Sequence, residues 1–368
     1  MVLNSATRTV VNRIGPYSAA AAPKPRAISP ILGHAISQIE KTFDPRLGKS
    51  FDLNWNKLHN DVVKELDGLY LDTSDNIDCM DKFEAGETLR FIKSLPRFAE
   101  QYNIENAVNG RVRTYGEFVT KKHRDYLMNE LEWRLRNSPR DPKTEQPVIG
   151  LMARNGALSE IGFNQSMDKF HGNPASRMHS PAAQLSLDNL LSIMDYTHPD
   201  TGTFNVVVPA GRLQQYGHNH FKQAIAPLSQ PLTDGIDRLA RDPRFGVCAT
   251  FHKGLNLSKN KWAQAGLWNS TWHGRFTNGE RTYSFGHPIS VTKEIDKSFA
   301  SRSGYDYLAT FSNFRAADVS VFNRDEVIIP EDQTAGAIMT NFGTTQVFDQ
   351  ERGKLKDVST VEFSRANR

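Results

Sequence analysis

The chain of 368 residues is longer than most single domains, and we expect it to form two. Charged residues make up 23% of it, and no apolar run is long enough to cross a bilayer, so we predict no transmembrane segment. The formal net charge is only +4 and the basic residues are spread out, so no basic face points to a nucleic-acid partner.

The first 30 residues are rich in Ala, Ser, Thr, Pro, Arg and Asn and contain no acidic residue. They lack the continuous apolar core of a Sec signal, and their composition predicts an unfolded leader. The same composition resembles the secretion leaders of bacterial type III effectors. That resemblance implies a secreted protein whose leader binds a secretion chaperone; the alternative is an ordinary disordered tail.

Residues 31–200 have the pattern of a mainly helical region. Residues 117–136 are predicted to form an amphipathic helix, which the Ser-Pro-Arg-Asp-Pro run at 138–142 should end because proline cannot continue it. A further helix is expected at 182–196, and residues 152–180 are expected to form an irregular loop. Five apolar residues at helical spacing predict another buried helix face: Leu58, Val62, Val63, Leu66 and Leu69.

The sequence changes in character near residue 200. Residues 204–208, Phe-Asn-Val-Val-Val, form a β-branched run closed by Pro209, which predicts a strand. Short strands and short helices are expected from there to about residue 348. We therefore predict an α+β protein with a helical region at 31–200, a mixed β-sheet domain at 201–350 and a polar tail at 351–368.

The two cysteines, Cys79 and Cys248, lie far apart in the sequence and in apolar surroundings, so we expect packed, reduced thiols rather than a disulfide. Asp78 and Asp81 lie on either side of Cys79 and oppose formation of a thiolate. This disfavours Cys79 as the nucleophile of a cysteine protease or acyltransferase, which we keep as a third hypothesis.

Two other groups of residues could bind a ligand. His218 and His220 alternate and would share one side of a strand, but a metal site needs a third or fourth ligand, so we expect no metal. An aromatic and basic cluster could stack on a planar ring or pack in the core, and the sequence leaves both open. It consists of Trp262, Trp268, Trp272, His273 and Arg275.

Three short segments between residues 246 and 340 carry a more complementary set of side chains. The run Phe251-His252-Lys253-Gly254 ends an apolar strand, and its glycine would let a ligand approach the backbone. Ser290 and Thr292 are two residues apart, so both hydroxyls should lie on one side of a strand. Glu326 directly precedes the apolar run Val-Ile-Ile-Pro at 327–330. Each segment alone also has a purely structural explanation.

In this order the segments resemble the ADP-ribosyltransferase fold of bacterial toxins and effectors. In that family a first strand ends in an aromatic residue, Arg or His, and then Gly. A second strand carries a Ser-x-Ser/Thr motif that leads into a helix, and a third segment presents the catalytic Glu before an apolar strand. The matches here are residues 251–254, Ser290-Val291-Thr292 with Ser298-Phe299-Ala300, and residues 326–330.

Two departures from the family pattern bear on specificity. The first motif has one residue too many, so His252 or Lys253 could fill the Arg/His position. Arg324 lies two residues before Glu326, where family members that modify arginine carry Glu or Gln. The acceptor group therefore stays open between a protein side chain, a nucleotide and a small molecule.

The resemblance implies NAD as the substrate. Glu326 would stabilise the positive charge that develops on the ribose as nicotinamide leaves. Ser290 and Thr292 would order the site, and His252 or Lys253, with Gly254, would bind the ribose or the diphosphate. Tyr283, Phe285 or Phe299 would stack on the nicotinamide.

Our first hypothesis is a mono-ADP-ribosyltransferase, secreted by a bacterium, that modifies a host protein in the cytosol or at a membrane of the host cell. An NAD hydrolase is a close alternative. A second class is a non-catalytic effector that keeps a degenerate form of the fold and binds a host protein through its helical half.

Overall fold

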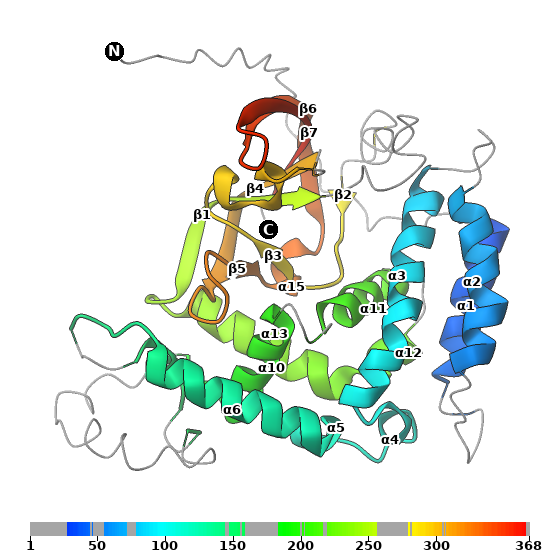
Figure 1. Cartoon of the computed structure of the whole chain (residues 1–368), viewed down its shortest axis with the longest axis horizontal. Helices are drawn as coiled ribbons and strands as arrows, with labels where there is room; N and C mark the ends of the chain where they lie inside the picture. Colours follow the sequence, from blue (N-terminus) through cyan, green and yellow to red (C-terminus); the bar gives the residue numbers. More distant parts are fainter. Residues whose placement is uncertain are drawn as a thin grey trace.

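The computed structural model describes residues 28–44, 46, 55–71, 79–143, 147–154, 157–158, 183–198, 201, 203–215, 219–255, 279, 282–303, 305 and 307–365. Helices dominate this part of the chain as far as Arg241, and a mixed β-sheet follows (Figure 1). The α+β class predicted from the sequence, with a helical region before a mixed sheet, is confirmed. None of the described helices is long and apolar enough to cross a membrane.

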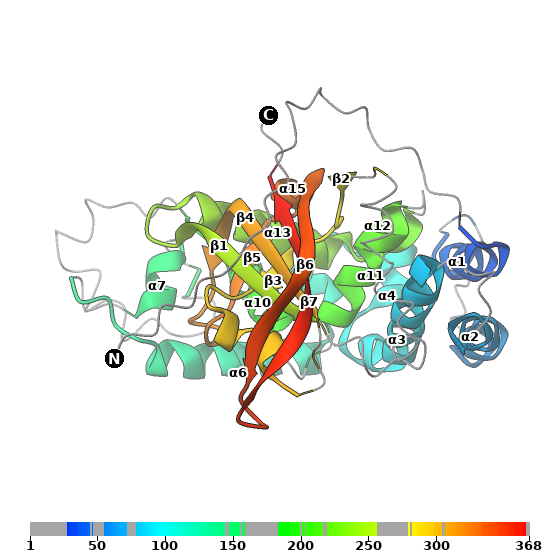
Figure 2. The same cartoon turned by 90° about the horizontal axis from the view of Figure 1, so that it is seen from above.

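The helices before the sheet cover most of the described N-terminal chain. They are α1 (Pro30–Thr42), α2 (Trp55–Leu71), α3 (Cys79–Gln101), α4 (Ile104–Val108), α5 (Tyr115–Phe118), α6 (Lys121–Asn137), α7 (Val148–Met152), α10 (Leu187–Thr197), α11 (Phe204–Gln215), α12 (His220–Ala224) and α13 (Ala226–Arg241). Helices α1 and α2 lie at one end of the molecule, away from the sheet (Figures 1 and 2).

Several helices form where apolar periodicity predicts them. In α2, Val62, Val63, Leu66 and Leu69 are all buried. Helix α6 ends at Asn137, directly before the Ser-Pro run that was expected to stop it. The predicted helix at 117–136 is in fact divided, because α5 ends at Phe118 and α6 begins at Lys121. Thr114 and Glu117 form a capping box that gives α5 its own N-terminus.

The strand predicted at residues 204–208 is wrong, because this run forms the first half of helix α11. Val206, Val207 and Val208 are buried, and α11 packs against α3. Burial against another helix outweighs the weak strand preference of β-branched residues. Helices continue to Arg241 and the first strand begins at Gly246, so the change from helix to strand comes later than the change in sequence character.

The described strands form a seven-stranded mixed sheet. They are β1 (Gly246–Leu255), β2 (Thr282–Tyr283), β3 (Ile289–Val291), β4 (Tyr307–Asp318), β5 (Val327–Ile329), β6 (Ala337–Asp349) and β7 (Lys354–Ser364), with two 3-10 turns, η4 (Ile295–Lys297) and η5 (Phe299–Ser301), after β3 and the short helix α15 (Glu331–Thr334) after β5. The main order is β2-β6-β7-β4-β5-β3, and only β4 and β7 pair in parallel.

The sheet curls so that its first and third strands meet. Strand β1 pairs with β4 along one edge, while β7 and then β5 pair with the other edge of β4. Strand β3 pairs with β5, and a bridge between His252 and Thr292 joins the end of β3 back to β1. Strands β1, β4, β5 and β3 therefore close a small ring, which brings the three sequence motifs to one place.

The helical part and the sheet share one hydrophobic core. The larger buried cluster contains residues of α1 to α13 and also Ala317, Val319, Phe322 and Ile328 from the sheet region. A second cluster, which includes Phe251, packs among the strands. Helix α13 lies directly against β4, and Figure 1 shows the sheet resting on α10 and α13. The position of the strand ends is therefore tied to the helices.

Candidate active site

Glu326 lies directly before β5 and accepts hydrogen bonds from two side-chain donors. Its side chain is 8% exposed. Ser290 Oγ, on the neighbouring strand β3, donates to Glu326 Oε1 at 2.5 Å, and Asn323 Nδ2 donates to Oε2 at 2.6 Å. Ser290 reaches the carboxylate because it pairs with Ile328, two residues after Glu326, in the antiparallel register of β3 and β5. Both carboxylate oxygens are thus fixed.

Burial raises the pKa of the Glu326 carboxyl above its usual value. The bonds from Ser290 and Asn323 favour the ionised form and oppose that effect, as does the positive charge of Lys253. The net effect is a raised pKa, because burial disfavours the ionised carboxyl more than these interactions favour it. Perturbation of this kind is common at functional sites.

Lys253 and His252 point to different surroundings, as successive residues of a strand do. Lys253 Nζ donates to the carbonyl of Ser290 at 2.9 Å and lies 5.3 Å from the centre of the Phe204 ring. His252 Nδ1 lies 3.4 Å from Thr310 Oγ1 of β4, and burial lowers the pKa of its imidazole. Lys253 is therefore the member of the pair that acts on Glu326.

The hydroxyl of Thr292, the residue directly after β3, has a different partner from that of Ser290. Ser290 and Thr292 are both partly exposed while Ile289 and Val291 are buried, so the strand alternates as predicted. Thr292 Oγ1 donates to the carbonyl of Glu294 at 2.9 Å, and the backbone of Thr292 exchanges two hydrogen bonds with His252. Thr292 thus joins β1 to β3, whereas Ser290 contacts the carboxylate.

Gly254 is surrounded by the chain itself. A Cβ atom at this position would lie 2.0 Å from the backbone nitrogen of Ala300 and 2.5 Å from the carbonyl carbon of Phe299. The glycine therefore lets turn η5 pack directly on β1. This close approach holds the turn that follows the Ser-Val-Thr motif against the first motif.

The three aromatic candidates differ in exposure. Tyr283 and Phe285 are buried and pack edge to face in the second core, with ring centroids 4.7 Å apart. Phe299 is 49% exposed, stacks on Tyr305 and has the guanidinium of Arg302 4.7 Å from its ring centre. Of the three, only Phe299 is exposed.

Sequence reasoning missed Asn323. It concentrated on Arg324, whose side chain is 89% exposed and pairs with Asp325 at 3.5 Å. Asp325 has a φ of 65°, a left-handed conformation that Asp tolerates better than most residues. This turn places Asn323 beside the Glu326 carboxylate. The sequence did contain a signal for this contact, because the amide of Asn323 lies only three residues before Glu326.

Of the other candidates, the structure describes the side chains of Cys248 and His220. The packed thiol expected for Cys248 is wrong, because its side chain is exposed. His220 Nδ1 lies 3.3 Å from Glu40 Oε1, and no cluster of metal-binding side chains occurs among the described residues. Cys79 is the first residue of α3. The described residues do not include the Cys79 side chain or His218. They also exclude most of the loop at 152–180 and the aromatic cluster at 262–275.

No family model matches the chain, and no curated protein matches it. Among solved structures, one that is similar is the ADP-ribosylating toxin BECa, part of a binary enterotoxin of C. perfringens, crystallised with NADH. The two are 14% identical, the match covers 49% of this chain and 43% of that chain, and the TM-score is 0.28. The match spans less than half of either protein.

Proposed function

We propose that the protein is a mono-ADP-ribosyltransferase that cleaves NAD beside Glu326 and transfers ADP-ribose to a protein acceptor. The observation that carries the proposal is the Glu326 carboxylate, buried and held at both oxygens by Ser290 and Asn323. The resemblance of the three motifs to the ADP-ribosyltransferase family supports the same assignment.

The chemistry requires a fixed negative charge beside a ribose. The bond between ribose C1′ and the nicotinamide nitrogen breaks, and its electron pair leaves with neutral nicotinamide. The ribose carries positive charge in the transition state, as in glycoside hydrolysis. A nucleophile of the acceptor then bonds to C1′ and loses a proton. The Glu326 carboxylate stabilises the cationic ribose, and its remaining lone pairs can accept a hydrogen bond from a ribose hydroxyl.

The neighbouring residues have separate roles in this proposal. Lys253, the cation on the Glu326 side of β1, is our choice over His252 for binding the diphosphate. Phe299 is our choice for stacking on the nicotinamide because its ring is exposed. Thr292 and Gly254 hold β1, β3 and η5 together, while Tyr283 supports the sheet from within the core.

The composition of residues 1–30 extends the proposal to a secreted bacterial effector that acts on a protein inside a host cell, with a secretion chaperone bound to its leader. An experiment with labelled NAD and host-cell lysate tests this directly. We expect a labelled protein band with the native protein and none with Glu326→Gln. Equal labelling by both proteins would refute the role of Glu326.

Two alternatives give different results in the same experiment. An NAD hydrolase would release nicotinamide without labelling a protein. A non-catalytic effector would do neither, and calorimetry would detect no heat of NAD binding. The second alternative is favoured by Arg324, which is highly exposed at the position where arginine-modifying members of the family carry an orienting Glu or Gln. Binding of NAD with nicotinamide release that depends on Glu326 would exclude it.

A further inference from the structure

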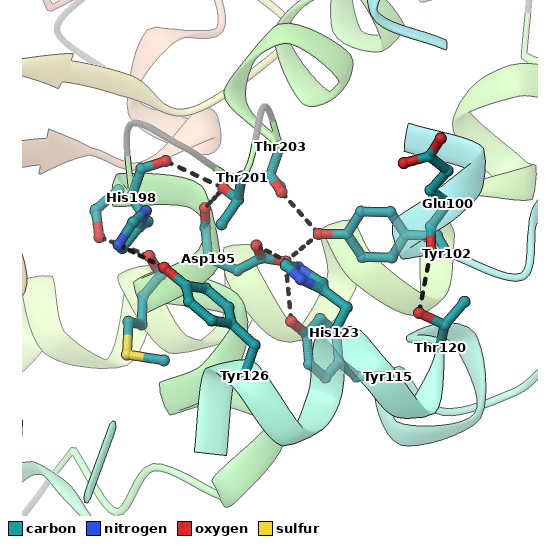
Figure 3. A network of polar contacts seen from close by, with 12 residues as sticks. Glu100, Tyr102, Tyr115, Thr120, His123, Tyr126, Asp195, His198, Thr201 and Thr203 are labelled. Carbon is teal, nitrogen blue, oxygen red and sulfur yellow. Dashed lines mark hydrogen bonds and ion pairs between the residues drawn. The ribbon is translucent and has the colours of Figure 1, made fainter. Parts of the chain in front are cut away.

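A buried polar network lies behind the candidate site, on the helical side of the shared core. Its centre is Asp195, a fully buried residue near the end of α10 (Figure 3). Asp195 Oδ2 accepts hydrogen bonds from the hydroxyls of Tyr102 and Tyr115, the second at 3.0 Å. His123 Nε2 lies 3.1 Å from Oδ1. Tyr102 follows α3, Tyr115 begins α5 and His123 is in α6, so one carboxylate fixes α10 relative to three elements.

The next residue, Tyr196, reaches from α10 to the beginning of β3. Its side chain is 2% exposed, and its hydroxyl donates to the carbonyl of Pro288 at 3.0 Å. Pro288 lies two residues before Ser290. Burial, and after it the charge of Glu326, raises the pKa of the Tyr196 phenol well above its usual value. Tyr196 thus holds the strand that supplies the donor to Glu326 Oε1.

The third residue, Thr197, holds the donor to the other carboxylate oxygen. The carbonyl of Thr197 accepts a hydrogen bond from Asn323 Nδ2 at 3.3 Å, and the same nitrogen donates to Glu326 Oε2 at 2.6 Å. An amide group has two hydrogens, and these two acceptors use both. The Asn323 side chain therefore has one favourable orientation, which the end of α10 determines.

Helix α6 adds a contact to the same turn. Arg134 Nη1 donates to the carbonyl of Phe322, the residue before Asn323. Arg134 is itself held by Glu130 at 2.8 Å on the same helix. The turn that carries Asn323 and Glu326 is thus attached to the helical part at two points.

We propose that the last turn of α10, residues 195–197, is the positioning element of the Glu326 site, with Asp195 as the residue that fixes it. The catalytic importance of this element rests on the proposed function, whereas its role in positioning Glu326 does not. The helical part then contributes to the active site.

The test measures the pKa of Glu326 by NMR titration of protein labelled at the glutamate side-chain carboxyl carbons, with Glu326→Gln to assign the signal. Asn323→Ala and Tyr196→Phe should each raise this pKa, because each weakens a donor to the ionised carboxylate. Each should also lower kcat for nicotinamide release, by about tenfold for Asn323→Ala, with little change in KM for NAD.

Asp195 is tested with a conservative pair of variants. In Asp195→Asn the amide oxygen can still accept from both tyrosines, and the amide NH2 can donate to His123 Nε2. This variant should keep the native pKa of Glu326 and the native kcat, whereas Asp195→Ala should shift both as Asn323→Ala does. Tyr126→Phe is the control, since the Tyr126 hydroxyl forms a hydrogen bond with His198 Nε2 and not with Asp195, and the phenylalanine ring can still stack on His123.

The outcomes separate the two proposals. A native pKa of Glu326 in folded Asn323→Ala and Tyr196→Phe would overturn the positioning role, whatever the activity. Shifted pKa values in a protein that releases no nicotinamide would support the positioning role and refute the proposed function. If Asp195→Ala does not fold, Asn323→Ala and Tyr196→Phe decide whether the end of α10 positions Glu326, because each removes only a side-chain polar group.

Discussion

The substitution Ser290→Ala isolates the interaction on which the proposed activity depends. It removes the donor that lies 2.5 Å from Glu326 Oε1 and leaves the β3 backbone pairing in place. A hydrogen bond to a charged group contributes about 1.5–3 kcal/mol. Since each 1.4 kcal/mol is about a factor of ten in rate, kcat/KM for nicotinamide release should fall roughly 10- to 150-fold.

Thr292→Val is the matched control for this substitution. Thr292 lies two residues away on the same side of the chain, and its hydroxyl donates to the carbonyl of Glu294. Each variant loses a side-chain hydrogen bond, so both should be destabilised in urea unfolding, by about 1 kcal/mol for Thr292→Val and by about 1.5–3 kcal/mol for Ser290→Ala, whose hydroxyl bonds to a charged group. Thr292→Val should nevertheless keep kcat/KM within about threefold of the native value, because its hydroxyl does not contact the carboxylate.

The pH profile gives a second readout of Ser290→Ala. Glu326 must be ionised to stabilise the ribose cation, and the lost hydrogen bond favours the ionised form. The acid limb of the pH profile of kcat/KM should therefore move to higher pH in Ser290→Ala and stay in place in Thr292→Val. Equal loss of activity in the two variants, or an acid limb that does not move, would refute the assignment of Ser290.

Three further outcomes are expected. Glu326→Gln should raise the Tm at neutral pH, because it replaces a buried carboxylate with a neutral amide. Folding raises the pKa of Glu326, so this group stabilises the fold below its unfolded pKa of 4.5 and that stabilisation is lost as the pH rises through the folded pKa. The gain in Tm should therefore vanish in acid, where the native carboxyl is also neutral. Gly254→Ala should cost about 1–3 kcal/mol in urea unfolding, since its Cβ meets backbone at 2.0 Å, whereas Gly343→Ala, with a nearest contact of 3.7 Å, should cost less. Lys253→Gln should raise KM for NAD more than Lys253→Arg does, measured by nicotinamide release.

The pairing of Ser290 with Glu326 lies within reach of sequence reasoning because it depends on local patterns. A hydroxyl alternates with apolar residues in one short strand, and a carboxylate directly precedes another apolar run. When the two strands pair antiparallel, the serine hydroxyl of one lies beside the carboxylate that precedes the other. The choice between His252 and Lys253 depends on how strand β1 is oriented between β3 and β4, which the motif alone does not specify.

Local preference misled the prediction where burial in the helical core decided the outcome. The three valines at 206–208 favour a strand in isolation, yet α11 buries them beside α3. Cys248 shows the opposite error, since its apolar neighbours suggested burial and its side chain faces outward on β1. In both cases the face that a side chain takes is set by partners distant in the sequence.

The contacts that hold Glu326 are of this long-range kind. Thr197 and Asn323 are 126 residues apart, Tyr196 and Pro288 are 92 apart, and Arg134 and Phe322 are 188 apart. All three contacts end on a backbone carbonyl, of Thr197, Pro288 or Phe322, so the acceptor residue can have any side chain and the sequence pattern does not reveal it. A carboxylate whose burial opposes its ionisation needs rigid donors, and here the helices that share its core supply that rigidity.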